Sequence, residues 1–351
     1  MSRVYLDWNA TAPLRPEARA AMADAMDVVG NPSSVHAEGR AAKMLMERAR
    51  ETIAVALGAQ GADIVFTSGA TEGAALALAD RGLSCAGIEH DCVRAWCNED
   101  VAVDADGQVT VPDPSTATLQ LANSETGVIQ TLPQGLGGSD LTQAFGKIPF
   151  GFEWLGVTIG FVSAHKLGGP RGIGALILPK GYEIEARTRG GGQELGRRAG
   201  TENLIGIAGF AAAAAAAERD LTGGMAENLT EMRDHLQTRL EDGAENTMFP
   251  GRESRRLPQT LSILTPGWRG ETQVMQMDLA GFAVSAGSAC SSGKVRDSGV
   301  LRAMGVQPDD AGCALRVSFG YATTAEELDR FADAWLTAHA RWQGKQGKVG
   351  R

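Results

Sequence analysis

The sequence contains little cysteine, no long apolar run and no excess of basic residues. Its 351 residues include five cysteines, and none of these forms a C-x-x-C pair. A disulfide framework is therefore not expected, a reducing compartment is favoured, and no metal site is predicted. No stretch approaches the roughly 20 apolar residues of a membrane span, and the N-terminus lacks the apolar segment of a signal peptide. These absences favour a cytoplasmic protein without a membrane partner.

Acidic residues outnumber basic ones. There are 42 Asp and Glu against 33 Lys and Arg, which gives a formal charge of -9. A protein that binds the nucleic-acid backbone is usually strongly basic, so no nucleic-acid partner is expected. With 43% hydrophobic and 21% charged residues, the chain suits a globular protein with a sizeable core, and its length favours about two domains.

Short apolar segments alternate with helical periodicity through the first two thirds of the chain. Asp63 to Thr67 is a predicted strand, followed at once by the turn Ser68 to Thr71 and a predicted helix from Gly73 to Asp80. Further predicted strands are residues 117–121, 157–162 and 173–178, and further predicted helices are residues 17–26 and 39–57. This alternation predicts an α/β fold with a parallel or mixed sheet.

The last third of the chain suggests a second, smaller domain. A long polar helix is predicted over residues 218–241, with short strands at 261–264, 283–285 and 315–318. The segment 323–342 begins with Thr followed three residues later by Glu, which is typical of a capping box on a closing helix.

Two segments after strands carry residues suited to chemistry. Ser68 to Thr71 lies where a strand meets a helix, so its N–H groups and the Thr71 hydroxyl could hold a phosphate. An ordinary N-cap turn is the alternative. Lys166 ends an apolar strand before a glycine-rich loop, a position where an amine can form a Schiff base with an aldehyde cofactor. An exposed surface lysine is the alternative there.

Two further segments consist largely of small residues. Gly190 to Asn203 is rich in glycine and permits close backbone approach to a ligand or to another subunit, although a solvent loop has the same composition. Ser285 to Gly293 places Cys290 among small residues that offer little packing, which favours a reactive thiol over a core cysteine.

These segments, in this order, resemble those of the cysteine desulfurases, which are pyridoxal-phosphate enzymes of the class V aminotransferase group. The resemblance covers nearly the whole chain, and its motifs are YLD at 5–7, GNPSSVH at 30–36, TSGATE at 67–72, SAHK at 163–166, GGGQE at 190–194, SAGSACSSG at 285–293 and LRVS at 315–318.

The resemblance implies a fold type I enzyme that binds pyridoxal 5'-phosphate. A large domain, residues 12–240, carries the cofactor on a mostly parallel sheet. Residues 1–11 and 241–351 form a small α+β domain with the catalytic cysteine loop. A homodimer is also implied, because the family completes each cofactor site with a residue from the partner subunit.

Individual cofactor contacts follow from the same resemblance. Lys166 corresponds to the lysine that binds the cofactor aldehyde, Asp140 to the carboxylate at the ring nitrogen, and Gln143 to the residue at the ring oxygen. His90 corresponds to the histidine that stacks on the ring, and Ser124 lies in the cofactor-binding segment. The phosphate-holding positions correspond to Ala70, Thr71, Ser163, His165 and Thr201, with Thr201 reaching in from the partner.

The resemblance also assigns the substrate side. Arg316 corresponds to the arginine that binds the carboxylate of L-cysteine, and Asn123 to a substrate-binding position. Cys290 corresponds to the nucleophile that takes the sulfur as a persulfide and releases alanine. The segment from Cys290 to Gly305 resembles the long loop of the branch that delivers sulfur to scaffold proteins for iron–sulfur cluster or thio-cofactor synthesis.

The chain also departs from the family pattern. Leu195 replaces the arginine after GGGQE, and Ser124 replaces the second asparagine of an NNEIG-like segment. Residues 128–139 are short, so we expect an irregular loop there, an open groove where a crossover helix would pack, and slow or partner-dependent catalysis. Two alternatives stay open: a selenocysteine lyase or another class V reaction, and a catalytically weakened dimeric binding module.

Overall fold

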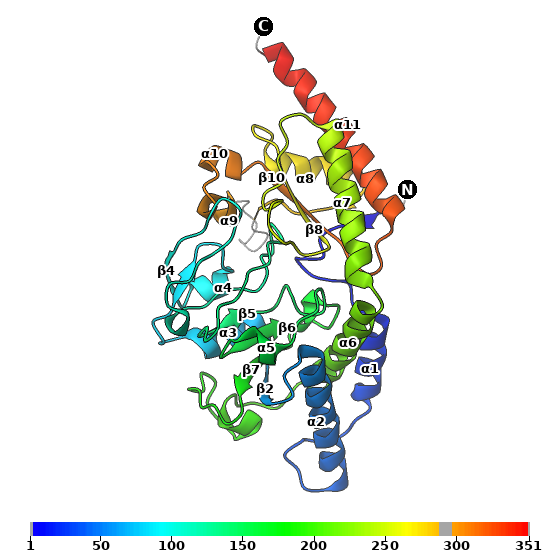
Figure 1. The fold of residues 1–351 in the computed structure, drawn as a ribbon. Helices are drawn as coiled ribbons and strands as arrows, with labels where there is room; N and C mark the ends of the chain where they lie inside the picture. Colours follow the sequence, from blue (N-terminus) through cyan, green and yellow to red (C-terminus); the bar gives the residue numbers. More distant parts are fainter. Residues whose placement is uncertain (1–2, 288–296, 350–351) are drawn as a thin grey trace.

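A four-stranded sheet forms the centre of the larger part of the protein (Figure 1). The computed structural model describes residues 3–287 and 297–349. The strand order is β2 (Ala62–Thr67), β7 (Gly174–Pro179), β6 (Gly160–Ser163) and β5 (Ser139–Asp140). β7 is antiparallel to both of its neighbours, and β5 is parallel to β6. The α/β fold predicted from the sequence is confirmed. Of the two sheet types that the sequence left open, parallel or mixed, the sheet is mixed: among these four strands only the β5–β6 pairing is parallel, whereas the resemblance implied a mostly parallel sheet.

The predicted strand at 117–121 is reduced to isolated bridges. Ala117 bridges Ser84 and Thr118 bridges Gly138, both in parallel. Beyond them lies a pair of parallel strands, β3 (Ser84–Ala86) and β4 (Asn98–Val101). Because β5 is only two residues long, it offers segment 117–121 too few partners for a continuous ladder.

Helices cover both faces of the sheet. α1 (Pro16–Met26), α2 (Ala37–Leu57) and α6 (Leu204–Thr222) pack together on one face, and α3 (Ala70–Leu78) packs on β6 and β7 from the other. Within β2, the alternating side chains Ile64 and Phe66 join the core under α2, while Val65 joins the core under α3. This alternation explains why a strand that is buried on both faces is continuously apolar.

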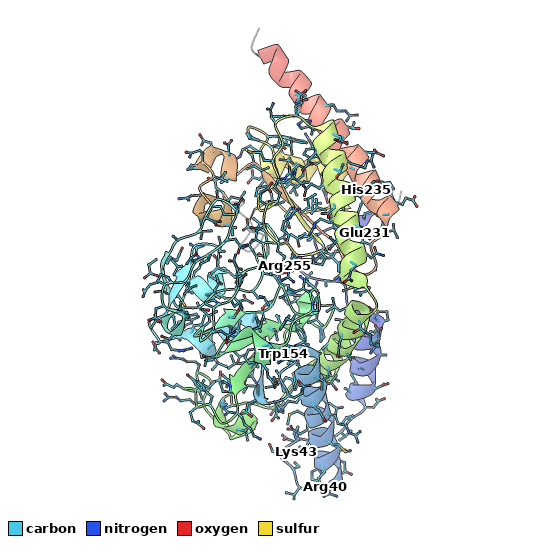
Figure 2. All side chains as sticks on the ribbon, viewed as in Figure 1. Arg40, Lys43, Trp154, Glu231, His235 and Arg255 are labelled. Atoms are coloured by element: carbon cyan, nitrogen blue, oxygen red, sulfur yellow. The ribbon has the colours of Figure 1, made fainter. Side chains whose placement is uncertain are left out.

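The long helix predicted over 218–241 is wrong, because the chain turns at Gly223 and Gly224. α6 ends at Thr222, Gly224 adopts a φ of 87°, and a new helix α7 (Met225–Gly243) begins. α7 lies beside the closing helix α11 (Ala325–Val349) (Figure 1). Figure 2 shows its exposed residues Glu231 and His235, while its apolar side faces a second core.

The second core belongs to the smaller part of the protein. It is built on an antiparallel pair, β8 (Thr260–Leu264) and β10 (Ala314–Ser318), and on a parallel pair, β1 (Val4–Tyr5) and β9 (Phe282–Ala283). α7, α8 (Gly270–Leu279) and α11 pack around these strands. The predicted capping box is present at the start of α11, where the Thr324 hydroxyl accepts from the Glu327 N–H and the Glu327 carboxylate accepts from the Thr324 N–H.

The two cores divide at the turn between α6 and α7, because Leu229, Leu236 and Leu240 of α7 belong to the second core. The domain boundary at residue 240 expected from the sequence stays a prediction. The N-terminal segment crosses from one core to the other: Asp7 bridges Ser318, and the Ala12 N–H donates to the carbonyl of His165.

The remaining elements are short. They are α4 (Asp91–Arg94), α5 (Phe152–Leu155), α9 (Gly299–Ala303), α10 (Pro308–Ala311), and single turns of 3-10 helix at Pro114–Thr116, Ala164–Lys166 and Gln193–Gly196. No helix in the described ranges is long and apolar enough to cross a membrane.

Residues 128–139 form an irregular segment, as predicted. They contain isolated bridges and no helix, and Ser139 begins the short strand β5. In place of a crossover helix, the side chains of Leu132 and Leu136 from the segment itself pack in a cluster with Leu119 and Val157. The loop leucines therefore occupy part of the surface where we expected an open groove.

Candidate active site

A cavity of about 540 Å³ lies between the sheet, the amino end of α3 and the N-terminal segment. Its volume is within the usual range for cofactor and ligand sites. Ten residues predicted from the sequence line it: Ala70, Thr71, His90, Ser124, Asp140, Gln143, Ser163, His165, Lys166 and Arg316. Asn123 and Thr201 are not among the lining residues, and Cys290 lies outside the residues that the structure describes.

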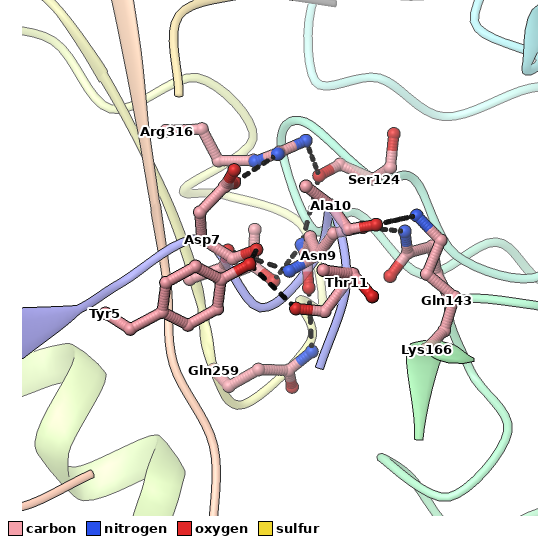
Figure 3. Close-up of polar contacts among 12 residues, drawn as sticks. Tyr5, Asp7, Asn9, Ala10, Thr11, Ser124, Gln143, Lys166, Gln259 and Arg316 are labelled. Carbon is pink, nitrogen blue, oxygen red and sulfur yellow. Dashed lines mark hydrogen bonds and ion pairs between the residues drawn. The ribbon is translucent and has the colours of Figure 1, made fainter. Parts of the chain in front are cut away.

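Lys166 enters the cavity from the single 3-10 turn that follows β6. Its Nζ donates to the carbonyls of Asn9, at 2.6 Å, and Ala10, at 3.0 Å (Figure 3). Both acceptors lie on the N-terminal segment. The amine is thus held in place by neutral main-chain acceptors, in a position where an aldehyde could reach it.

The amino end of α3 forms one side of the cavity. Its N-cap, Gly69, has a φ of 155° and offers no side-chain cap, and Ser68, Gly69, Ala70 and Thr71 all line the cavity. The first N–H groups of a helix lack partners within the helix and favour an anion. Ser163 lies close to Gly69, whose Cβ, if present, would be 3.5 Å from Ser163 Oγ. This end of α3 is suited to hold a phosphate group.

His165 adds a neutral ring to this side of the cavity. Burial, followed by the positive charges of Lys166, Lys147 and Arg171, lowers the pKa of His165 to about 4. Its Nδ1 lies 3.1 Å from the Thr11 hydroxyl. At neutral pH the imidazole is therefore uncharged and acts as a hydrogen-bonding group.

Asp140 is held by main-chain hydrogen bonds to a neighbouring segment on each side. The Leu121 N–H donates to the Asp140 carbonyl at 2.9 Å, and the Leu141 N–H donates to the carbonyl of Phe161 at 3.1 Å. One carboxylate oxygen, Oδ1, accepts from the Thr142 N–H at 2.8 Å. An anionic carboxylate at this position can hold a proton on a ring nitrogen, which fits the role implied by the resemblance.

Two side-chain amides hold the segment Ile88 to His90 in place through hydrogen bonds. Gln120 and Asn123 donate to the carbonyl of Ile88 at 2.7 and 3.1 Å. The Asn123 oxygen also accepts from the N–H groups of Glu125 and Thr126. Asn123 therefore shapes the turn beside the cavity, and in this structure its side chain serves that turn rather than lining the substrate space.

Glu89 and Cys92 flank His90 at the cavity. His90 caps α4, with its Nδ1 accepting from the Cys92 N–H at 3.1 Å. Burial, with the nearby Asp140 carboxylate acting in the same direction, raises the pKa of Glu89 well above its usual value. Glu89 Oε1 accepts from the Gln120 N–H, while Oε2 is buried without a partner. Beside His90 there is therefore a buried carboxyl group whose charged form is disfavoured.

Arg316 reaches the cavity from β10 (Figure 3). One terminal nitrogen pairs with the Asp7 carboxylate at 2.7 Å, and the other donates to the carbonyl of Ser124 at 3.2 Å. Its Nε is buried without a partner. The guanidinium is thus held in one orientation with a donor to spare, which suits recognition of a carboxylate.

The residues on either side of segment 288–296 lie at the cavity. Ser285 exchanges main-chain hydrogen bonds with Arg316, and the buried Ser298 donates through its hydroxyl to the carboxylate of Glu125, at 2.5 Å. Gly299 and Val300 line the cavity directly. Because α9 begins at Gly299, the loop expected to extend from Cys290 to Gly305 is helical in its described second half.

The glycine-rich segment that contains Thr201 is anchored elsewhere on the same subunit. Glu194 accepts two hydrogen bonds from Arg50, at 2.9 and 3.0 Å, and one from the Phe66 N–H, at 2.9 Å. Thr201 is exposed. A contact from Thr201 to a neighbouring subunit's cofactor site stays a prediction.

Sequence reasoning missed two buried polar residues: Asn9, which lines the cavity, and Lys147, which does not. Asn9 contacts Ser124, Gln143, Lys147 and Lys166. The signal for Lys147 was its position four residues after Gln143, a spacing that brings side chains together on a helical turn. No local signal marks Asn9, because its partners are distant in the sequence.

Comparison with known proteins identifies the family. Residues 4–92 and 100–331 match the aminotransferase class-V family. The cysteine desulfurase IscS of Dictyoglomus turgidum is 36% identical over 367 residues, which cover 94% of this chain and 93% of that protein. The cysteine desulfurase of Frankia sp. is 39% identical over 384 residues, which cover 94% of this chain and 90% of that protein.

Solved structures agree with this match. A NifS-like protein from Rickettsia africae superimposes with a TM-score of 0.85 at 30% identity, covering 95% of this chain and 98% of the other. Because the match covers nearly all of both chains, the shortened segments of this protein do not remove a domain. The chain belongs to the class-V aminotransferase family.

Proposed function

We propose that this protein is a cysteine desulfurase that binds pyridoxal 5'-phosphate on Lys166 and takes sulfur from L-cysteine. The observation that carries the proposal is the convergence of the Lys166 amine, the Asp140 carboxylate and the amino end of α3 in one cavity. The relatives named cysteine desulfurase support the same substrate.

The residues present fit this cofactor. Lys166 supplies the amine that binds the aldehyde, Asp140 holds a proton on the ring nitrogen, and the α3 end with Ser163 holds the phosphate. When bound, the cofactor supplies an electron sink for bond cleavage at the substrate carbon atoms. Lys166 Nζ then moves the α-proton, and Arg316 orients the substrate through its carboxylate.

The sulfur step is assigned to Cys290. The thiolate attacks the sulfur of the bound substrate, so that a sulfur–sulfur bond forms while the carbon–sulfur bond breaks. Cysteine and the Cys290 thiol thereby become alanine and a Cys290 persulfide, with atoms and electrons conserved. A second protein, such as a scaffold for iron–sulfur cluster assembly, receives the sulfur in our proposal.

We also propose a homodimer in which Thr201 of each subunit completes the phosphate site of the other. The exposure of Thr201 and the firm anchoring of its loop through Glu194 support this arrangement. Sedimentation should show a dimer, and cofactor affinity should fall on dilution. A monomer that holds the cofactor tightly would contradict the shared site.

We also propose a cytoplasmic location, which the free thiols Cys85, Cys92, Cys97 and Cys313 support.

The catalytic proposal is tested with three variants. Purified protein should be yellow and should release alanine from cysteine. Lys166→Ala should lose the borohydride-reducible cofactor adduct, and Cys290→Ser should keep the adduct but stop sulfur release. Cys313→Ser, at a buried position that does not line the cavity, is the matched control and should retain activity. Equal sulfide release by Cys290→Ser would overturn the nucleophile, and alanine from selenocysteine alone would identify a selenocysteine lyase.

A further inference from the structure

Lys147 is a buried amine placed behind the cavity. The residue is 8% exposed and does not line the cavity itself. Nζ donates to Gln143 Oε1 at 2.5 Å and to Asn9 Oδ1 at 3.2 Å. Both acceptors are amide oxygens, so neither supplies the negative charge that a buried ammonium normally requires.

The amine works as a hydrogen-bond donor. Burial lowers the pKa of Lys147 well below its ordinary value, and the positive charges of Lys166 and Arg316 act in the same direction. A neutral amine still carries two N–H groups, which matches its two acceptors. In either protonation state, Lys147 therefore presents hydrogen to the oxygen of Gln143.

This contact fixes which end of the Gln143 amide faces Lys166. With Oε1 held by Lys147, the nitrogen points the other way, and Nε2 donates to the carbonyl of Asn9 at 3.0 Å. The same carbonyl accepts from Lys166 Nζ at 2.6 Å (Figure 3). Nε2 has a second hydrogen beyond the one that Asn9 accepts, and Gln143 lines the cavity.

Asn9 holds this arrangement rigidly. Its Nδ2 donates to the carbonyl of Ser124 at 3.0 Å and to the Thr260 hydroxyl at 2.8 Å. Its main-chain N–H donates to the Ser318 hydroxyl at 3.0 Å. The residue is 1% exposed. Asn9 thus joins both cores to the pair formed by Gln143 and Lys147.

We infer that Lys147 is a positioning residue, which together with Asn9 locks the Gln143 amide so that its nitrogen faces the cavity. Gln143 Nε2 then donates a hydrogen bond to the ring oxygen of the bound cofactor. In the opposite orientation of the amide, Gln143 Oε1 would face and repel that oxygen. The inference rests on the proposed function, because it concerns the group that Lys166 binds.

The test uses the absorbance of the cofactor-loaded protein as a function of pH. The ring oxygen and the Lys166 nitrogen share a proton, and a donor to the oxygen weakens the hold on that proton. Lys147→Met keeps the unbranched chain but removes the donor, so the Gln143 amide is free to turn over. The absorbance midpoint is expected to rise by about 0.5 to 1 pH unit, the value of one ordinary hydrogen bond.

A double-variant cycle separates action through Gln143 from a direct effect of the amine. Gln143→Leu alone should also raise the midpoint, and adding Lys147→Met to it should cause no further rise. The titratable groups around the cavity, among them Glu89, His90, Asp140 and His165, stay the same in all four proteins. Equal shifts from Lys147→Met in both backgrounds, or no shift in the wild-type background, would overturn the inference.

Two further measurements keep the result interpretable. Lys147→Gln retains an N–H donor on a shorter side chain, so its absorbance midpoint should lie between those of wild type and Lys147→Met. If Lys147→Met does not fold, Lys147→Gln is compared with wild type in its place. Thermal unfolding of the cofactor-free proteins reports the fold separately. A wild-type protein with no chromophore on Lys166 would refute the proposed function, whereas a wild-type-like titration of Lys147→Met would refute only the role of Lys147.

Discussion

At Gly174, a single added methyl group should disturb the phosphate-binding side of the site. It begins β7 and pairs with both Thr67 and Ser163. A Cβ at this position would lie 2.4 Å from the Val162 carbonyl oxygen and 2.7 Å from Gly69 Cα. Both neighbours are main-chain atoms, so these two steric clashes can be relieved only if β6 and the turn before α3 move.

The expected cost follows from this geometry. Overpacking a well-packed core costs about 1–3 kcal/mol, and we expect the upper end, about 3 kcal/mol, because no flexible side chain can yield. Displacement of the Gly69 turn should also weaken cofactor binding, since an error of about 1 Å in a positioned group can cost on the order of 100-fold. Gly174→Ala should therefore lose both stability and cofactor affinity.

The assay is urea unfolding of the cofactor-free protein, with cofactor affinity measured separately by fluorescence. Gly192→Ala is the matched control, because its Cβ would meet no atom within 4 Å and its φ is -86°. The control should change the free energy of unfolding by no more than about 0.5 kcal/mol. A Gly174→Ala protein that matches this control in both measurements would refute the reasoning.

Three further predictions concern stability. Glu194→Ala should lower the free energy of unfolding in urea by about 3 kcal/mol, because Arg50 and the Phe66 N–H lose a buried carboxylate; a loss below about 1 kcal/mol would contradict this. Leu195 is 81% exposed and has a φ of 56°, so Leu195→Gly should raise the thermal midpoint by relieving left-handed strain, and a clear decrease would count against that. Because the pKa of His165 is lowered from 6.5 to about 4 in the folded protein, the unfolded chain binds more protons between these values, and stability should fall as pH falls through this window. His165→Gln should flatten that part of the pH dependence, and an unchanged profile would exclude His165 as its source.

The elements that the sequence predicted correctly are those with local signals. β2 and α3 follow from a short apolar run, a glycine turn and a helical pattern, all within residues 62–78. The two failures depended on distant partners or on backbone geometry. Segment 117–121 lacked a long neighbouring strand, and the helix predicted over 218–241 was broken by two glycines that a periodic pattern does not register.

The same distinction holds at the site. Lys166 and Arg316 were predicted because they lie in the motifs SAHK and LRVS, and Asp140 was predicted from the family resemblance as a whole. Asn9 was missed because its contact with Lys147 spans 138 residues of sequence. A residue whose role is to join distant segments has no periodicity or spacing of its own, so only the fold reveals it.

The shortened segment before Asp140 bears on the expectation of slow chemistry. That expectation assumed that a carboxylate without a crossover helix would be loosely held. In the structure, Asp140 is clamped by main-chain hydrogen bonds to Leu121 on one side and, through Leu141, to Phe161 on the other. Its main-chain support therefore comes from segment 117–121 and from β6, and does not require a crossover helix.

Glycine makes this clamp possible. A Cβ at Gly137 would lie 2.9 Å from the Ala117 carbonyl oxygen, and one at Gly138 would lie 3.0 Å from a methyl group of Leu78. The segment therefore lies so close to its neighbours that only glycine fits, and Leu136 seals it against Leu119. Exposure is confined to Thr131, Gln134 and Gly135 at the tip. A low rate in the isolated protein would accordingly point to the sulfur-transfer step or to subunit assembly, since the carboxylate that supports the electron sink is already firmly placed.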